Sequence, residues 1–290
     1  MLLFVLKILS FLCVLAGVAF YTLVERKIIR YAQIRVGPNK VSIAGIFQPF
    51  RDALKLLSKD IFFPTRSNWS VFKLRPSISL MLALIAYLLI IDYQFMGIIQ
   101  PLVLWFLLIL RLGVFPRTLA GWSRNSSYAR VGGYRRLSQT ISYEVALFLS
   151  LFIPLRIYKR LSLNRVNYAT SAFLRILVLL FLIVILAETN RAPFDLSEGE
   201  SELVSGFNIE YGGSGFTLFF LAEYAIILIL SLIISLLYFA NIFWGFIFIF
   251  ILLVIRASYP RLRYDTLIKF IWRQYLPLVT FVCAFVIILI

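Results

Sequence analysis

The 290-residue chain is too hydrophobic for a soluble globular protein. Hydrophobic residues make up 62% of it and charged residues 14%, a balance typical of proteins that cross the bilayer several times. It contains no histidine, and its two cysteines, Cys13 and Cys283, lie near opposite ends of the chain. These residues cannot form a metal or haem site in the usual ways, and they do not indicate a disulfide. Any metal or redox centre must therefore belong to a partner.

The net charge of +16 raises the question of nucleic acid binding. The Lys and Arg residues, however, cluster just outside the hydrophobic runs rather than along a soluble face. Anionic lipid, such as cardiolipin, and orientation in the membrane account for that pattern better. We therefore expect lipid contacts and no nucleic acid.

The hydrophobic runs predict an all-α, polytopic membrane protein with about eight transmembrane helices in a single domain, residues 1–290. The expected spans are 1–24, 76–92, 96–114, 137–155, a fifth ending at 187, 215–239, a seventh ending near 255, and 276–290. A β-barrel would need alternating polar and apolar residues, and these runs do not alternate.

The first loop, 25–75, carries eleven cations and three acids. The positive-inside rule places such a loop on the cytoplasm-like side, which in mitochondria is the matrix. Within it, apolar residues recur at helical spacing, and polar residues occupy the opposite face. The apolar positions are Ile46, Phe47, Phe50, Ala53, Leu54 and Leu57. This pattern predicts an amphipathic helix lying in the membrane interface.

Two predicted spans contain a carboxylate away from their ends: Glu144 in the fourth and Glu223 in the sixth. An ionisable group at membrane depth usually faces the protein interior and marks an ion or proton pathway. The alternative is a helix-to-helix hydrogen bond with a purely structural role. The sequence pattern alone does not favour one of these over the other.

An acidic loop, 188–214, follows the fifth span, and the stretch 188–211 holds six carboxylates against one cation, Arg191. Repulsion, with desolvation where the loop is screened from water, is expected to raise the pKa of some of these groups toward neutrality. The alternative is a solvated acidic loop. In a helix Asp195, Glu198 and Glu202 would share a face, whereas in an extended segment Glu198, Glu200 and Glu202 would align.

Four blocks of the chain resemble the subunit 1 family of NADH:ubiquinone oxidoreductase, respiratory complex I. They cover residues 25–60, 138–147, 188–211 and 256–278, and the two most specific motifs are PFDLSEGESELVSG and GIFQPFRDALK. Arg51 stands where the family usually has a small residue. The resemblance spans nearly the whole chain in order.

The resemblance implies a core membrane subunit of the proton-pumping enzyme in the mitochondrial inner membrane. Such a subunit forms the access tunnel for ubiquinone, the substrate, while NADH, FMN and iron–sulfur clusters are bound by partner subunits. Expected partners are the other membrane-arm subunits and the quinone-reducing module. The implied tunnel residues are Arg26, Arg35, Phe50, Asp52 and Phe220, and no catalytic residue is expected. The implied proton path is Glu144, Glu188, Asp195, Glu198, Glu200, Glu202, Glu210 and Glu223.

Two other function classes fit a membrane protein of this size. An ion-coupled transporter should show paired halves with broken helices near the bilayer centre, and no such repeat is visible in this sequence. A structural scaffold has no need of ionisable residues in several spans, each of which costs about 2.5 to 3.5 kcal/mol on insertion scales. For Arg26 and Arg35, simple flanking of a span on the positive side is the alternative to a role beside the quinone.

Overall fold

The computed structural model describes residues 2–60, 67–96, 102–123, 126–157, 168–195, 211–239 and 241–289. The described chain is helical, with no strand. Its helices are α1 (Leu2–Ala32), a 3-10 turn (Ile43–Gly45), α2 (Gln48–Leu57), α3 (Trp69–Met96), α4 (Leu102–Trp122), α5 (Ser127–Ile157), α6 (Tyr168–Glu188), α8 (Gly213–Ile234), α9 (Phe243–Ser258), α10 (Tyr264–Phe270) and α11 (Leu276–Leu289). Two π-helical segments, Ser235–Phe239 and Ile271–Tyr275, extend α8 and join α10 to α11.

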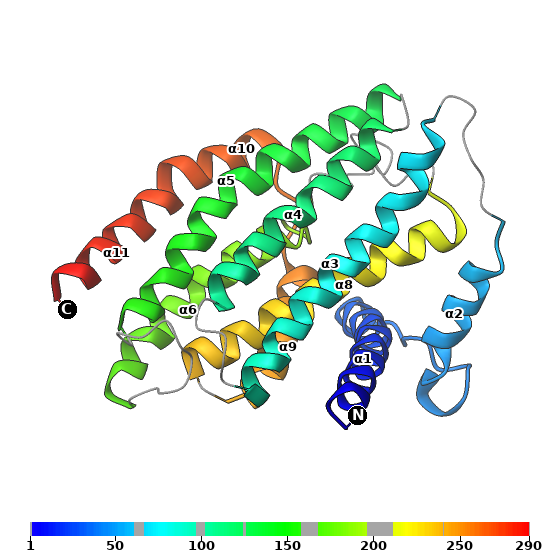
Figure 1. Ribbon diagram of the computed structural model, residues 1–290, viewed down its shortest axis with the longest axis horizontal. Helices are drawn as coiled ribbons and strands as arrows, with labels where there is room; N and C mark the ends of the chain where they lie inside the picture. The colour runs from blue at the N-terminus through cyan, green and yellow to red at the C-terminus, as the bar shows by residue number, and fades with distance from the viewer. Residues whose placement is uncertain are drawn as a thin grey trace.

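Six stretches of the described chain are long and apolar enough to cross a membrane, and two shorter apolar helices, Leu177–Glu188 and Phe243–Ser258, accompany them. Most of the long helices run side by side and α1 lies across them, with α2 at one end of the molecule and α11 at the other (Figure 1). The prediction of an all-α polytopic membrane protein is thereby confirmed.

The helices extend further than the hydrophobic runs indicated. Helix α1 continues to Ala32 and α3 begins at Trp69, so both ends of the predicted loop 25–75 are helical. Helix α5 begins at Ser127 and takes up part of the segment expected to be polar loop before residue 137. Hydropathy detects only the part of a helix that lies in lipid. The backbone hydrogen bonding of the helix continues beyond that part into the polar region. Glu144 therefore lies in the middle of α5 rather than near its start.

Helix α8 occupies the centre of the fold. It packs against α1, α2, α3, α6 and α9, and residues as far apart as Phe219, Leu230 and Ile234 are fully buried on it. A helix that is hydrophobic on all sides is the one most readily enclosed by others. The acid that it carries, Glu223, is thus placed in the protein interior.

The predicted amphipathic helix is confirmed as α2, which packs on α1 and α8. Its apolar face turns away from the rest of the chain: Phe47, Leu54 and Leu57 are exposed. Phe50 is also 45% exposed and makes an edge-to-face contact with Phe20, with ring centroids 6.1 Å apart. This face is therefore available to lipid or to a partner rather than to the core of this chain.

The close approach of α2 to the start of α8 requires a glycine at position 213. Gly213 has a positive φ of 53°, and a Cβ added there would lie 2.7 Å from the carbonyl oxygen of Lys59. We predict that Gly213→Ala loosens α2 and destabilises the fold by about 1–3 kcal/mol. Faster proteolysis in the α2 segment and a lower melting temperature of the purified complex would be the readouts.

The neighbouring Gly212→Ala variant is the matched control, because Gly212 has an ordinary φ and an added Cβ would lie 4.0 Å from the nearest atom, the carbonyl oxygen of Asp60. Equal effects of the two substitutions would contradict the steric account.

Candidate functional site

A cluster of charged side chains lies inside the helix bundle. It comprises Arg117 from α4, Arg136 from α5, Glu188 from the end of α6, Arg191 from the segment after α6, and Glu223 from α8, all of them buried. Charges taken out of water are tolerated only when they are paired and hydrogen-bonded. The stability of the cluster therefore depends on the contacts among its side chains.

Glu223 is held between two arginines. Arg136 Nη1 donates a hydrogen bond to Glu223 Oε1 at 3.1 Å, and the two side chains are 2% and 7% exposed. Arg191 Nη2 lies 3.9 Å from the other carboxylate oxygen. Screening by water is nearly absent at this depth, so each of these charges depends on the others.

The turn after α6 places Arg191 beside α8. Asn190 adopts a positive φ of 48°, a conformation that Asn tolerates better than most residues. Gln139 on α5 secures both sides of this turn, because its side-chain amide donates to the carbonyls of Ala187 and Phe194, each at 3.0 Å. The Arg191 guanidinium then lies 4.4 Å from the centre of the Tyr224 ring, a cation–π contact.

Two acids lie close together between α4, α5 and α6. Glu144 and Glu188 line the same small cavity, together with Arg111 and Thr140. Glu144 forms an ion pair with Arg111. Glu188 interacts electrostatically with Glu144 and also with Arg117 and Arg136. The three predicted membrane acids are thus neighbours: two share a cavity, and the third shares Arg136 with Glu188.

Glu25, expected at the start of the first loop, is a further member of this network. It lies within α1 and is 4% exposed. It pairs with Arg256 of α9 and accepts a 2.6 Å hydrogen bond from the Tyr224 hydroxyl. The buried positions Val14, Val18 and Tyr21 precede it at spacings of four and three, so helical periodicity carried past the apolar run would have indicated its burial.

The predicted tunnel residues are distributed over α1, α2, α8 and the first loop. Arg26 at the end of α1 bonds Asp52 of α2, and Gln48 donates to the same carboxylate at 2.9 Å. Arg35 is exposed in the loop after α1. Phe220 on α8 packs against Phe216, with ring centroids 4.3 Å apart. Of these residues, the structure thus brings Arg26 and Asp52 into contact.

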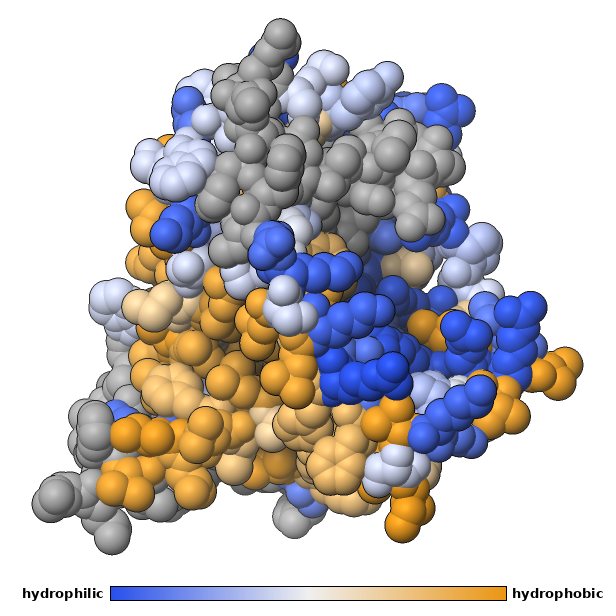
Figure 2. Space-filling model, turned by 90° about the vertical axis from the view of Figure 1, so that its right-hand side faces the viewer, coloured by the Kyte–Doolittle hydropathy of each residue, from blue (hydrophilic) through white to orange (hydrophobic). Residues whose placement is uncertain are grey.

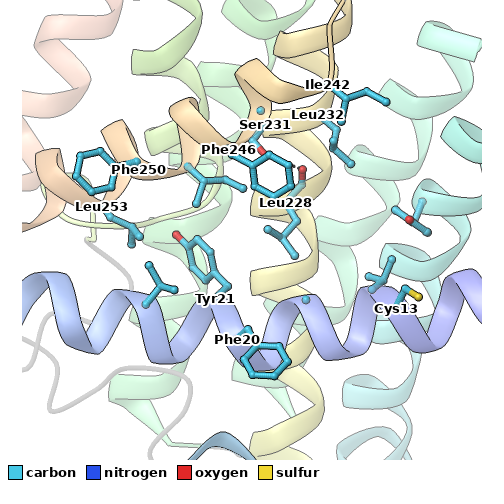
Figure 3. Close-up of a pocket in the computed structure, with 16 residues that line it drawn as sticks. Cys13, Phe20, Tyr21, Leu228, Ser231, Leu232, Ile242, Phe246, Phe250 and Leu253 are labelled. Atoms are coloured by element: carbon cyan, nitrogen blue, oxygen red, sulfur yellow. Dashed lines mark hydrogen bonds between the residues drawn. The ribbon is translucent and has the colours of Figure 1, made fainter. Parts of the chain in front are cut away.

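An apolar groove of about 470 Å³ opens between α1, α8 and α9. In Figure 3, α1 crosses α8 at a steep angle, and Phe20, Tyr21, Phe246 and Phe250 are among the side chains that line the space. Its volume is in the range of pockets that hold small apolar ligands. The Tyr21 ring lies 5.3 Å from that of Tyr224, so the groove ends close to the buried network.

Of the predicted acidic loop, the described part contains Asp195, which lies 3.4 Å from Arg261. Four further predicted proton-path residues, Glu198, Glu200, Glu202 and Glu210, are outside the described residues. Within the described part of the chain, no group of three or more Cys, Asp or Glu side chains could hold a metal ion.

Comparison with known proteins gives one consistent family. The NADH dehydrogenase family model matches residues 6–287. A protein of Aedes aegypti named NADH-ubiquinone oxidoreductase chain 1 is 43% identical over 94% of this chain and 91% of its own length. Proteins of the same name from Heterololigo bleekeri and Locusta migratoria are 41% and 44% identical, over 97% and 93% of this chain and 95% and 90% of their own lengths.

The pairing of Arg136 with Glu223 generates a stability prediction. Arg136→Met leaves the carboxylate without its closest partner and is expected to cost about 3–5 kcal/mol. Arg130→Met on the exposed part of α5 is the control and should be nearly neutral. The measurement is the melting temperature and the assembled yield of the complex.

A second variant separates loss of the ion pair from loss of packing. In Arg136→Met combined with Glu223→Gln, neither charge of the pair is left buried, although Arg191 loses its carboxylate partner. The double variant should therefore be more stable than the sum of the two single effects implies. A double variant as unstable as the sum of the two single variants would show that the pair is not coupled.

Proposed function

Because this chain belongs to the family of NADH-ubiquinone oxidoreductase chain 1, we propose that it forms the ubiquinone access path of that enzyme and links quinone reduction to proton translocation through its buried carboxylates. The chain is a subunit of the NADH:ubiquinone oxidoreductase complex, so its partners are other subunits of that complex. We further propose that the complex lies in the mitochondrial inner membrane, and that anionic lipid surrounds this subunit. NADH, FMN and the iron–sulfur clusters are assigned to partner subunits.

The observation that carries the proposal is the position of three acids beside arginines of the helix bundle: Glu188 and Glu223 are buried, and Glu144, which is 28% exposed, pairs with Arg111. Glu223 lies between Arg136 and Arg191, and Glu188 lies near both Arg136 and Glu144. Carboxyl groups at this depth are costly to a membrane protein, and ionisable groups there usually serve ion or proton movement. In a membrane protein with a purely structural role, apolar side chains would hold the helices together equally well.

The apolar groove supports the quinone part of the proposal. Reduction of a quinone to a quinol takes up two protons and passes through species with negative charge. An apolar slot accepts the body and tail of such a molecule, and Tyr21 in its wall adjoins Tyr224, which bonds Glu25. A charge that arises near the inner end of the slot would therefore act on Glu25 and, through Tyr224, on Arg191.

The proton-path proposal is tested by neutral replacement of each acid. Glu144→Gln, Glu188→Gln and Glu223→Gln keep side-chain size and most hydrogen bonding but remove the exchangeable proton. We expect NADH:quinone turnover coupled to proton uptake to fall at least about tenfold in reconstituted membranes, because positioned proton transfer contributes about a hundredfold or more to rates. Native gels report assembly.

Asp265→Asn serves as the control for this series, because Asp265 is 59% exposed on α10. Full turnover and full pumping in the Glu144 and Glu188 variants would reduce these acids to packing residues and remove the proton path.

Phe50→Asp tests the role of α2 at the quinone entrance. The change places a charge on the exposed apolar face of this helix, at a cost of about 2.5–3.5 kcal/mol if the face meets hydrocarbon. We expect slower quinone reduction, with NADH oxidation by artificial acceptors largely unchanged. Equal loss of both activities would indicate failed assembly instead of a blocked entrance.

A further inference from the structure

A cationic hollow of about 450 Å³ lies where the end of α1, the loop after it and the start of α2 meet. Its lining includes Arg26, Arg30, Lys40 and Arg51, and no carboxylate is among the described residues that line it. Asp52 lies nearby and pairs with Arg26, which balances one of these charges. The three remaining cations make the hollow complementary to an anion.

One wall of this hollow is formed by the loop between α1 and α2, whose backbone is held by specific contacts. Lys27 Nζ donates to the carbonyl of Ala44 at 2.6 Å. Gly45 has a φ of 76°, and a Cβ at this position would clash with the carbonyl of Pro38. These contacts hold the backbone of the loop against the end of α1, so the cationic side chains project from a backbone of defined conformation.

The hollow lies at the depth of lipid headgroups if α1 crosses the bilayer. Arg30 follows the last residue of the apolar run, Val24, by six positions, which is about 9 Å along a helix axis. The headgroup layer on each side of the hydrocarbon core is about 5–8 Å thick. With α1 upright, the backbone of Arg30 therefore lies at the outer edge of the headgroup layer, and its long side chain can extend back to the phosphate groups.

Exposed apolar side chains adjoin the hollow. Arg51 of α2 lines the hollow, while Phe47, just before this helix, and Leu54 and Leu57 on it are 58%, 69% and 60% exposed. On the side of the molecule at which α2 lies, hydrophilic side chains gather beside a broad hydrophobic surface (Figure 2). An anionic group joined to apolar chains complements both the cationic hollow and the apolar side chains beside it. An acidic peptide or a free anion complements only the hollow.

We propose that this hollow binds the phosphate headgroup of an anionic phospholipid, with its acyl chains lying against the apolar face of α2. The proposal rests on the placement of the chain in a bilayer given under the proposed function. It does not depend on the quinone path or on the buried acids. It assigns Arg30, Lys40 and Arg51 to headgroup binding.

The test uses the intact complex in nanodiscs of phosphatidylcholine containing photoactivatable phosphatidylglycerol. Labelled peptides are mapped by mass spectrometry. We expect labelling within residues 30–57, reduced about fivefold by Lys40→Gln or Arg51→Gln, because one Lys or Arg near an anionic surface contributes about that factor. Lys55→Gln on the same helix, outside the hollow, is the matched control and should label as the unmodified complex does.

Any of several results would overturn the proposal. They are equal labelling of all variants, equal labelling by a photoactivatable phosphatidylcholine, and displacement of the label by inorganic phosphate, which would indicate a site for a free anion. Cross-links from the hollow to an acidic segment of a partner subunit, without lipid labelling, would also overturn it. Quinone turnover is measured on the same samples, so absence of labelling in the unmodified complex together with normal turnover would count against the lipid site alone.

Discussion

The buried ion pair between Arg136 and Glu223 is the interaction on which the interior of this protein depends. Its side chains are 2% and 7% exposed and come from α5 and α8. In a medium from which water is excluded, either charge left alone costs several kcal/mol. The pair therefore links α5 to the central helix, α8. Arg136 contacts only one carboxylate oxygen of Glu223. The turn after α6 places Arg191 near the second oxygen, so both oxygens have a nearby cation.

From this pair the polar contacts continue to the other side of α8. Glu223 and Tyr224 are consecutive, and they point to different partners: Glu223 meets Arg136, while Tyr224 contacts Arg191 and donates to Glu25. Glu25 in turn pairs with Arg256 of α9. The interior thus contains one connected set of charges that spans the bundle from α9 to α5. A change of charge at the groove beside α1 has a physical route to the acids between α4, α5 and α6, and this connection is the basis of the proposed coupling.

The parts of this architecture that depend on local pattern were predictable from sequence. The periodicity of residues 46–57 indicated α2, and uninterrupted apolar runs indicated the spans. The pairing of the buried charges was not predictable, because its partners are 87 residues apart for Arg136 and Glu223 and 199 apart for Tyr224 and Glu25. Local pattern indicates which face of a helix is buried but not which side chain from another helix meets it. Hydropathy also hid Glu25 and Arg136, because it assigns charged residues beyond an apolar run to loops.

The central claim is that buried carboxyl groups change protonation when quinone is reduced. Infrared difference spectroscopy of the complex before and after quinone reduction tests it most directly, because protonated and ionised carboxyl groups absorb at different frequencies. The account predicts a carboxyl signal in the unmodified complex that is lost or altered in Glu188→Gln and is retained when an exposed acid such as Asp265 is replaced. A signal that is identical in the unmodified complex and in the Glu144, Glu188 and Glu223 variants would contradict it.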